Sequence, residues 1–300
     1  MNTPAATRAG TAWLSPIPIF FVFLWSTGFV TAKFGLPYAP PLTFLILRCG
    51  MAVLVLLPVV LWSGAPWPRG RIGHMAVAGL LMQAGYLGGV WTSIKHGMPA
   101  GLSALIVGLQ PILTAFAAPL IGERVRPRQW LGLALGLSGV ALVVYAKISL
   151  AGLAPAAIAL CVLALVSITA GTMYQRRFCP SFDLRTGTLI QFAATVVAIV
   201  PLAVWLEGFD LSLSQVQWNA RFIGALLWSV FGLSIGAIFL LFKLISRNEA
   251  TQVTSLLYLT PPTTAVMAWL MFGEALSPAG LLGMAVAVVG VAFVVKKEKT

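Results

Sequence analysis

Charged residues are scarce in this chain of 300 residues: Asp, Glu, Lys and Arg make up 9% of it, whereas hydrophobic residues make up 59%. A soluble globular protein carries roughly a quarter of its residues as charged groups, because its surface faces water. The mean hydropathy is +0.96. These values exclude a water-soluble globule and favour a chain that lies mostly in a lipid bilayer.

Cysteine and histidine are also rare, with three and two residues. Cys49, Cys161 and Cys179 are odd in number and far apart, which argues against a disulfide framework and against a zinc site. His74 and His96 lie at opposite ends of one apolar segment, about 33 Å apart if it is helical, which disfavours an acid–base pair. The sequence has no GxxxxGK[ST] loop for ATP. We therefore expect no metal and no other cofactor.

Apolar runs of the length that a membrane-spanning helix needs, about 20 residues, occur ten times. Runs such as Leu131–Val144 are continuously apolar or small, unlike the alternating strands of a membrane barrel. The sequence predicts an all-α integral membrane protein with ten transmembrane helices. The predicted helices lie near residues 16–36, 40–62, 72–95, 98–121, 126–146, 154–174, 184–206, 218–244, 249–272 and 277–295.

The basic residues predict the orientation, because short cytoplasmic loops retain an excess of Lys and Arg. With the N-terminus in the cytoplasm, 14 of the 19 Lys and Arg residues fall on the cytoplasmic side, 4 fall outside, and Arg48 lies within a helix. We expect both termini in the cytoplasm. The net charge of +12 is then an orientation signal, and nucleic acid is not an expected partner.

The two halves of the chain resemble each other. A shift of 151 residues aligns Gly97–Val144 with Asn248–Val295, and 14 of the 48 paired positions are identical. We interpret residues 1–150 and 151–300 as two five-helix repeats, inverted because five is odd. Such inverted repeats are typical of secondary transporters, although a duplication kept only for packing is the alternative. The pairs include Pro111 with Pro262, Gly122-Glu123 with Gly273-Glu274, and Gly139-Val140-Ala141 with Gly290-Val291-Ala292; a shift of 143 pairs Thr43, Pro58 and Trp62 with Thr186, Pro201 and Trp205.

The first helix reads Leu24-Trp25-Ser26-Thr27-Gly28-Phe29, and the second opens with Pro41-Leu42-Thr43-Phe44. With the repeated Gly-Glu pairs, these segments make nearly the whole chain resemble the drug/metabolite transporter superfamily. The resemblance is to its ten-helix EamA-type members, and among them to the YddG group of aromatic and neutral amino-acid exporters. It implies a bacterial inner-membrane protein with a central cavity between the halves.

Arg48 is the single charged residue well inside a predicted helix, about 12 Å of rise from its start. A central Arg costs about 2.5 to 3.5 kcal/mol to insert, so it should face a cavity or a polar partner. Its guanidinium is suited to a substrate carboxylate; alternatively it links helices through backbone carbonyls or reaches outward to the interface. The corresponding residue of the second half, Gln191, is neutral, and all seven acids fall at helix ends, in loops or in the tail.

Aromatic and neutral polar side chains complete the predicted substrate site. Aromatic walls with a few hydrogen-bonding groups suit an amphipathic solute such as an aromatic amino acid. The alternative is that the Ser and Thr bond across helices and that the Trp and Tyr belong to the membrane interface. The candidate substrate-binding residues are Arg48, Gln83, Tyr86, Trp91, Ser103, Gln110, Trp228, Ser234, Thr254 and Tyr258.

Proline and glycine predict mechanical features. Pro111, Pro261 and Pro262 lie near the middle of matching helices and should kink them, as gates, as hinges or as static bends. Small-residue stripes on the fifth and tenth helices predict close packing, as scaffold or as a dimer contact. The stripe residues are Gly132, Gly136, Gly139, Gly283 and Gly290.

These observations predict a secondary transporter, an exporter of aromatic or neutral amino acids or related metabolites that works by alternating access. Its expected partners are a small-molecule substrate and membrane lipids, and the chain is expected to be a monomer or a homodimer. Transport of other small metabolites or drugs is the main alternative. An intramembrane enzyme acting on lipids is disfavoured, because converging acids, histidines or nucleophiles are lacking, and a passive pore would need oligomeric polar rings.

Overall fold

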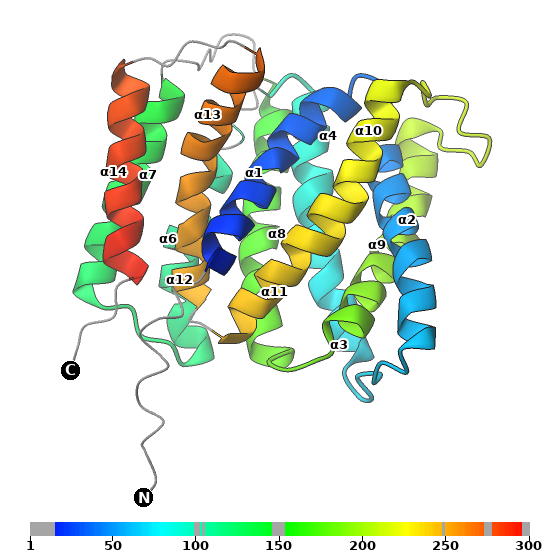
Figure 1. The fold of residues 1–300 in the computed structure, drawn as a ribbon, viewed down its shortest axis with the longest axis horizontal. Helices are drawn as coiled ribbons and strands as arrows, with labels where there is room; N and C mark the ends of the chain where they lie inside the picture. Colours follow the sequence, from blue (N-terminus) through cyan, green and yellow to red (C-terminus); the bar gives the residue numbers. More distant parts are fainter. Residues whose placement is uncertain are drawn as a thin grey trace, which may run out of the picture.

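The structure is a computed structural model that describes residues 16–98, 103, 106–145, 154–247, 250–272 and 278–295. The described residues form helices and turns and no strands, which confirms the predicted all-α class. Helices occupy part or all of each of the ten predicted ranges. They lie side by side as a bundle, and the described connections, such as those between α2 and α3 and between α8 and α9, lie at its ends (Figure 1).

Six helices run without interruption, and proline opens five of them. Proline suits the first turn of a helix because its missing N–H has no partner there in any case. The uninterrupted helices are α1 (Pro16–Gly35), α2 (Pro41–Trp62), α7 (Pro127–Tyr145), α8 (Pro155–Phe178), α9 (Leu184–Glu207) and α14 (Pro278–Val295).

The other described helical segments change their winding along their length. α3 (Ile72–Gly79) continues through the π-helix Leu80–Gly88 into α4 (Gly89–Lys95), and α10 (Ala220–Trp228) continues through the π-helix Ser229–Ala237 into α11 (Ile238–Arg247). Two segments contain 3₁₀ turns. In these, α6 (Gln110–Ala117) ends in Ala118–Ile121, and α12 (Ala250–Ser255) passes through Leu256–Leu259 into α13 (Thr260–Phe272).

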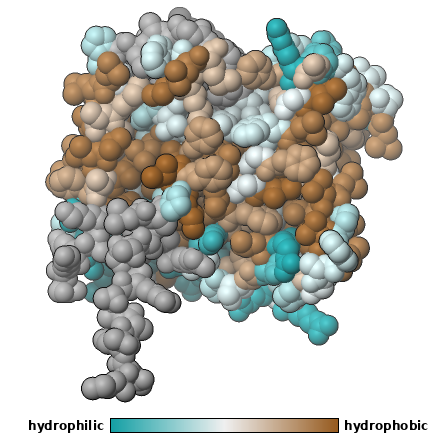
Figure 2. All heavy atoms as spheres, viewed as in Figure 1, coloured by the Kyte–Doolittle hydropathy of each residue, from teal (hydrophilic) through white to brown (hydrophobic). Residues whose placement is uncertain are grey.

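Five of the described helices are long and apolar enough to cross a membrane. Large apolar side chains also cover the outside of the bundle: Leu120, Val197 and Trp205 are each about three-quarters exposed or more. Figure 2 shows this apolar surface across the middle of one face, with hydrophilic residues gathered mainly toward its ends. Such a surface is suited to lipid rather than to water. The five spans are Pro41–Trp62, Pro155–Phe178, Leu184–Glu207, Ala220–Ser246 and Pro278–Val295.

The glycine stripes of α7 and α14 face each other, which confirms the predicted close packing. A Cβ atom on Gly132 would lie 2.6 Å from the carbonyl oxygen of Gly290, and one on Gly139 would lie 2.6 Å from that of Gly283. Only glycine permits so close an approach of two backbones. Each glycine stripe therefore packs against the other within this chain.

The two π-helices occupy corresponding places in the two halves. Each has nine residues, and their first residues are 149 positions apart, as 229 − 80. Polar side chains of neighbouring helices bond to carbonyls beside the first one: Ser167 Oγ donates to Leu81 O (2.9 Å), and Thr195 Oγ1 donates to Gly79 O (3.3 Å). Hydroxyl groups of neighbouring helices can bond to carbonyls where the winding of a buried helix departs from the regular α-helix.

The helical winding changes at the predicted hinges. Pro111 lies in the first turn of α6, directly after the turn at residues 108–109. Pro261 and Pro262 lie in the first turn of α13, directly after a 3₁₀ turn. A regular α-helical segment starts at each of these positions and needs no N–H from the proline ring. A role of these prolines as gates or hinges stays a prediction.

Candidate functional site

A pocket lies between α1, α2, the segment from Leu80 to Lys95 and the segment from Ser229 to α11. Both π-helices contribute to its wall, so the changes of winding occur where the helices border the pocket. The lining residues are Trp25, Gly28, Ala32, Arg48, Met82, Gln83, Tyr86, Leu87, Val90, Trp91, Ile94, Leu233, Ala237 and Ile238.

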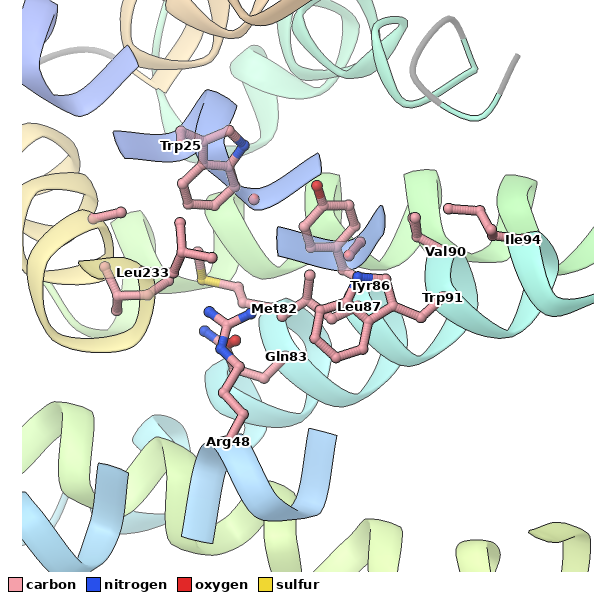
Figure 3. A pocket seen from close by; sticks show the side chains of 14 residues that line it. Trp25, Arg48, Met82, Gln83, Tyr86, Leu87, Val90, Trp91, Ile94 and Leu233 are labelled. Atoms are coloured by element: carbon pink, nitrogen blue, oxygen red, sulfur yellow. The ribbon is translucent and has the colours of Figure 1, made fainter. Parts of the chain in front are cut away.

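Arg48 supplies the positive charge of the pocket. It is buried at 4% exposure, and its Nε donates a hydrogen bond of 2.7 Å to Ser234 Oγ on the second π-helix. Its Cζ lies 5.9 Å from the centre of the Trp91 ring, a cation–π distance. Figure 3 shows the guanidinium reaching from α2 into the pocket. This placement favours the cavity-facing interpretation over a link to carbonyls or an outward reach.

Gln83 lies beside Arg48 in the same pocket (Figure 3). Its side chain is fully buried, and neither its amide nitrogen nor its amide oxygen has a hydrogen-bond partner. Buried polar groups in folded proteins are nearly always paired, so an unpaired one needs a reason. A donor and an acceptor next to a guanidinium are suited to the polar head of a solute.

Aromatic rings form the apolar part of the wall. Trp25 stacks on Tyr86 with ring centres 6.5 Å apart, and Trp91 stacks on Phe44 at 5.0 Å. In Figure 3, Trp25 lies across the pocket from Arg48. The cavity volume is about 60 Å³, room for roughly four to six water molecules. An aromatic side chain therefore needs a wider pocket than this conformation offers.

The structure brings Arg48, Gln83, Tyr86, Trp91 and Ser234 of the predicted residues together. It places other predicted residues elsewhere. Ser103 lies 3.4 Å from Ser93 Oγ and 3.4 Å from Cys161 Sγ, outside the pocket lining. Thr254 is buried in α12 and is not among the lining residues.

Gln110 and Tyr258 also lie outside the pocket. Gln110 Nε2 donates to Thr172 Oγ1 (3.2 Å) on α8. The ring of Tyr258 is fully buried against the backbone of Gly136, and its hydroxyl has no partner. The spacing along each helix indicated a polar face at these positions, but it could not indicate which neighbouring helix that face meets.

Trp228 borders a second hollow, on the other side of α1. Its Nε1 donates to Thr27 Oγ1 (2.8 Å), and both residues line this hollow between α1, α10 and α13. Arg221 lies at one end of it and Met267 belongs to its apolar wall. Trp228 is thus separate from the Arg48 pocket.

The pocket also contains residues that sequence reasoning did not select. Met82, Leu87 and Leu233 are apolar and resemble any other membrane-facing residue in the sequence. Trp25 was visible as an aromatic side chain in the first helix, but no periodic pattern distinguished it from an interfacial one. The π-helices shift the register within α3–α4 and α10–α11, so that regular helical spacing does not identify the lining.

The acids of the described residues lie away from the pocket. Glu123 pairs with Arg176 (3.1 Å), and Asp183 pairs with Arg185 (2.7 Å), both near helix ends. The bonds from Arg185 hold the pKa of the Asp183 carboxyl below its usual value. Glu207 and Asp210 lie at the end of α9 and in the connection after it. Among the described residues, no group of three His, Cys, Asp or Glu side chains could hold a metal ion.

A bundle of apolar helices around a narrow pocket, with a buried cation and aromatic walls, is the arrangement expected of a membrane transporter. Comparison with known proteins agrees. Residues 16–145 and 155–296 each match the EamA-like transporter family. The chain belongs to this family, which is part of the drug/metabolite transporter superfamily.

Several relatives match nearly the whole chain. "Uncharacterized transporter YvbV" of Bacillus subtilis is 29% identical and covers 93% of this chain and 90% of its own length. "Probable amino-acid metabolite efflux pump" of Salmonella typhimurium is 26% identical over 91% of this chain and 92% of its own. "Probable terminal-alkyne amino-acid exporter" of Streptantibioticus cattleyicolor is 24% identical over 92% and 91%.

A solved crystal structure has the same fold. It superposes with a TM-score of 0.75, covering 93% of this chain and 95% of the other, at 20% sequence identity. Family and fold together make this protein a membrane transporter.

Proposed function

We propose that the protein exports aromatic or neutral amino acids, or closely related carboxylates, across the bacterial inner membrane by alternating access. The observation that carries this proposal is the buried guanidinium of Arg48 in an aromatic pocket, with no described carboxylate to neutralise it. A carboxylate ligand supplies the missing charge, and the rings of Trp25, Tyr86 and Trp91 supply the apolar contact. We assign the protein transport and no catalytic step.

The proposed architecture is ten transmembrane helices in two inverted repeats, residues 1–150 and 151–300. Three observations support it. The family matches the chain twice, at residues 16–145 and 155–296. The two π-helices occupy corresponding positions. Helices that the repeat relates to each other also pack together, α2 against α9 and α7 against α14.

The proposed orientation has both termini in the cytoplasm. In Figure 1, the connections α2–α3 and α8–α9 and the end of α11 lie along one face of the bundle. These segments carry many of the basic residues, among them Arg71, Arg177 and Arg185. An excess of positive charge marks the cytoplasmic side. On this assignment the Arg48 pocket lies in the outer half of the membrane.

Export is the proposed direction, because two of the relatives are named as an efflux pump and an exporter of amino-acid compounds. The decisive experiment is uptake into proteoliposomes of labelled phenylalanine, alanine, a nucleotide sugar and an organic cation. Saturable transport of the amino acids is the expected result. Saturable transport of the nucleotide sugar alone or of the cation alone would show that the protein has a different substrate class. Absence of flux for every solute would reject the proposal.

The role of Arg48 has its own test. The Arg48→Ala variant should raise the KM for phenylalanine by about 10- to 100-fold, because a hydrogen-bonded ion pair is worth about 1.5–3 kcal/mol. The KM for phenylalanine amide should change far less. Arg71→Ala removes the same charge from an exposed connection and is the matched control. Equal losses for acid and amide would mean that Arg48 only holds helices together.

A further inference from the structure

A second group of buried polar side chains lies outside the Arg48 pocket, where α6, α8 and α9 meet. It consists of Gln110, Thr172, Gln175 and Gln191, which we name the glutamine cluster; each is at most 1% exposed. Gln110 Nε2 donates to Thr172 Oγ1 (3.2 Å), and Gln191 Nε2 donates to Gln175 Oε1 (3.0 Å). Thr172 and Gln175 are three residues apart on one face of α8, so the two bonds are neighbours.

The hydrogen bonds of the cluster leave half of its amide groups unused. Gln110 Oε1, Gln175 Nε2 and Gln191 Oε1 are buried without a partner. The hydroxyls of Thr114 and Thr188, each about one turn from a cluster glutamine, are also buried and unpaired. So many unpaired donors and acceptors in one place are costly in a membrane protein. They are explained if another conformation of the protein gives them a partner.

The cluster corresponds to the Arg48 pocket in the other half of the chain. Arg48 follows the first residue of α2 by seven positions, and Gln191 follows the first residue of α9 by seven, as 48 − 41 and 191 − 184. The 143-residue shift of the repeat pairs the two. In the proposed orientation α2 starts at the outer face and α9 at the cytoplasmic face, so the cluster lies in the cytoplasmic half.

The cytoplasmic end of α8 is tied down directly beside the cluster. Arg176 follows Gln175 in the chain; its Nε lies 3.1 Å from Glu123 Oε1, and its Nη1 donates to Ile245 O (2.7 Å). Arg177 Nη1 donates to Leu120 O (2.6 Å). These bonds link the end of α8 to the end of the α6 segment and to α11, next to the cluster along α8.

We propose that the glutamine cluster is a second solute-binding site, in the cytoplasmic half of the transport path, which opens when the bonds of Arg176 break. The proposal rests on the alternating-access function proposed above. The cluster offers amide donors and acceptors and no charged group. It therefore binds polar groups of a solute that carry no net charge, such as a zwitterion or an amide, together with their bound water.

Accessibility tests the proposal without any transport assay. In a variant whose three native cysteines are replaced by alanine, Thr172→Cys is exposed to a membrane-impermeant maleimide in inside-out and right-side-out vesicles. Labelling should occur from the cytoplasmic side only, and adding Arg176→Gln should accelerate it about tenfold by raising the open population. Excess phenylalanine should slow it. Absence of cytoplasmic labelling, with and without Arg176→Gln, would overturn the proposal.

Apolar substitution gives a second readout. Gln175→Leu and Gln191→Leu should cut the turnover of phenylalanine about tenfold, because the open cytoplasmic half would then offer fewer hydrogen bonds. The apparent Kd for phenylalanine added from the outside, measured from the change in tryptophan fluorescence, should stay within twofold of the wild-type value, since Arg48 is untouched. Gln217→Leu makes the same chemical change on an exposed side chain and should alter neither. Full turnover with higher thermal stability in both Leu variants would make the cluster a structural contact only.

The outcomes separate this proposal from the substrate assignment. If the wild-type protein binds no carboxylate, the assignment to amino acids fails, whereas cytoplasmic labelling at position 172 would still support the second site. If the Leu variants do not fold, as judged by size-exclusion chromatography, the cysteine-labelling result alone decides whether the glutamine cluster is a second solute-binding site.

Discussion

Glu207 holds Thr43 through two hydrogen bonds, one from the backbone N–H (2.8 Å) and one from the Oγ1 hydroxyl (2.9 Å) to the same carboxylate oxygen. Its other oxygen accepts the N–H of Leu42 (2.8 Å). The last residue of α9 thus satisfies free donors in the first turn of α2 and places a negative charge at its positive end. The pair joins the two halves of the chain at one face of the bundle.

Removing this carboxylate should weaken the fold. The Glu207→Ala variant leaves the first turn of α2 without its acceptors, and we expect a loss of about 1.5–3 kcal/mol in unfolding free energy. Thermal unfolding in detergent, followed by tryptophan fluorescence, measures it. Asp210→Asn removes an acid from the exposed connection three residues on and should change the midpoint far less. An unchanged midpoint for Glu207→Ala would show that water replaces the carboxylate.

Ser234 should determine how well Arg48 binds its ligand. The Ser234→Ala variant removes the acceptor of the Arg48 Nε hydrogen bond and frees the guanidinium to rotate. We expect the KM for carboxylate substrates to rise about 3- to 15-fold, which corresponds to about 0.7–1.6 kcal/mol. Ser229→Ala is the control, because Ser229 lies on the same π-helix but bonds to Leu226 O of its own segment. Equal effects of the two variants would contradict this role of Ser234.

The glycines of the α7–α14 contact should not tolerate a methyl group. Gly139→Ala and Gly290→Ala push a Cβ into the facing backbone, which costs about 1–3 kcal/mol by overpacking. Gly50→Ala places the same atom where nothing lies within 4 Å, and it should stabilise α2 by about 0.5–1 kcal/mol. The yield of monodisperse protein and the thermal midpoint measure all three. Similar midpoints for the Gly139 and Gly50 variants would contradict the close contact.

Acid should destabilise the protein partly through Asp183. Arg185 donates from Nε (3.0 Å) and Nη2 (2.7 Å) and lowers the pKa of Asp183 in the folded state. A lowered folded pKa contributes stability that is present above the unfolded pKa and is lost as the pH falls through the folded value. Asp183→Asn should therefore flatten the fall of the thermal midpoint between about pH 5 and 2. An equally steep fall in the variant would exclude Asp183 as a source of the pH dependence.

The fold was largely predictable from the sequence, because lipid imposes long apolar runs and proline and glycine mark their ends. The helices begin at Pro41, Pro127 and Pro278 within a residue or two of the expected positions. The paired glycines of α7 and α14 could also be recognised in the sequence, because stripes of small residues indicate close packing of helices. The ten-helix count, the inverted repeat and the orientation remain proposals that these features support.

The candidate site was predictable only in part. Arg48 stood out because a charge inside an apolar helix is costly, and Gln83, Tyr86 and Trp91 share the segment that borders it. Trp228 and Tyr258 have the same residue chemistry, yet they face a lateral hollow and the α7 backbone. Which face of a helix meets which neighbour depends on crossing geometry and on the π-helices, and neither leaves a local sequence pattern.

The contact between Gly139 and Gly283–Ala287 has a consequence for the order of assembly in the cell. α7 is made and inserted long before α14: positions 139 and 290 are 151 residues apart. At about 5–20 residues per second, α7 waits roughly 8–30 s for its partner. Throughout that interval its glycine stripe faces lipid or another nascent helix. The packing of α7 is therefore completed only after α14 has been made.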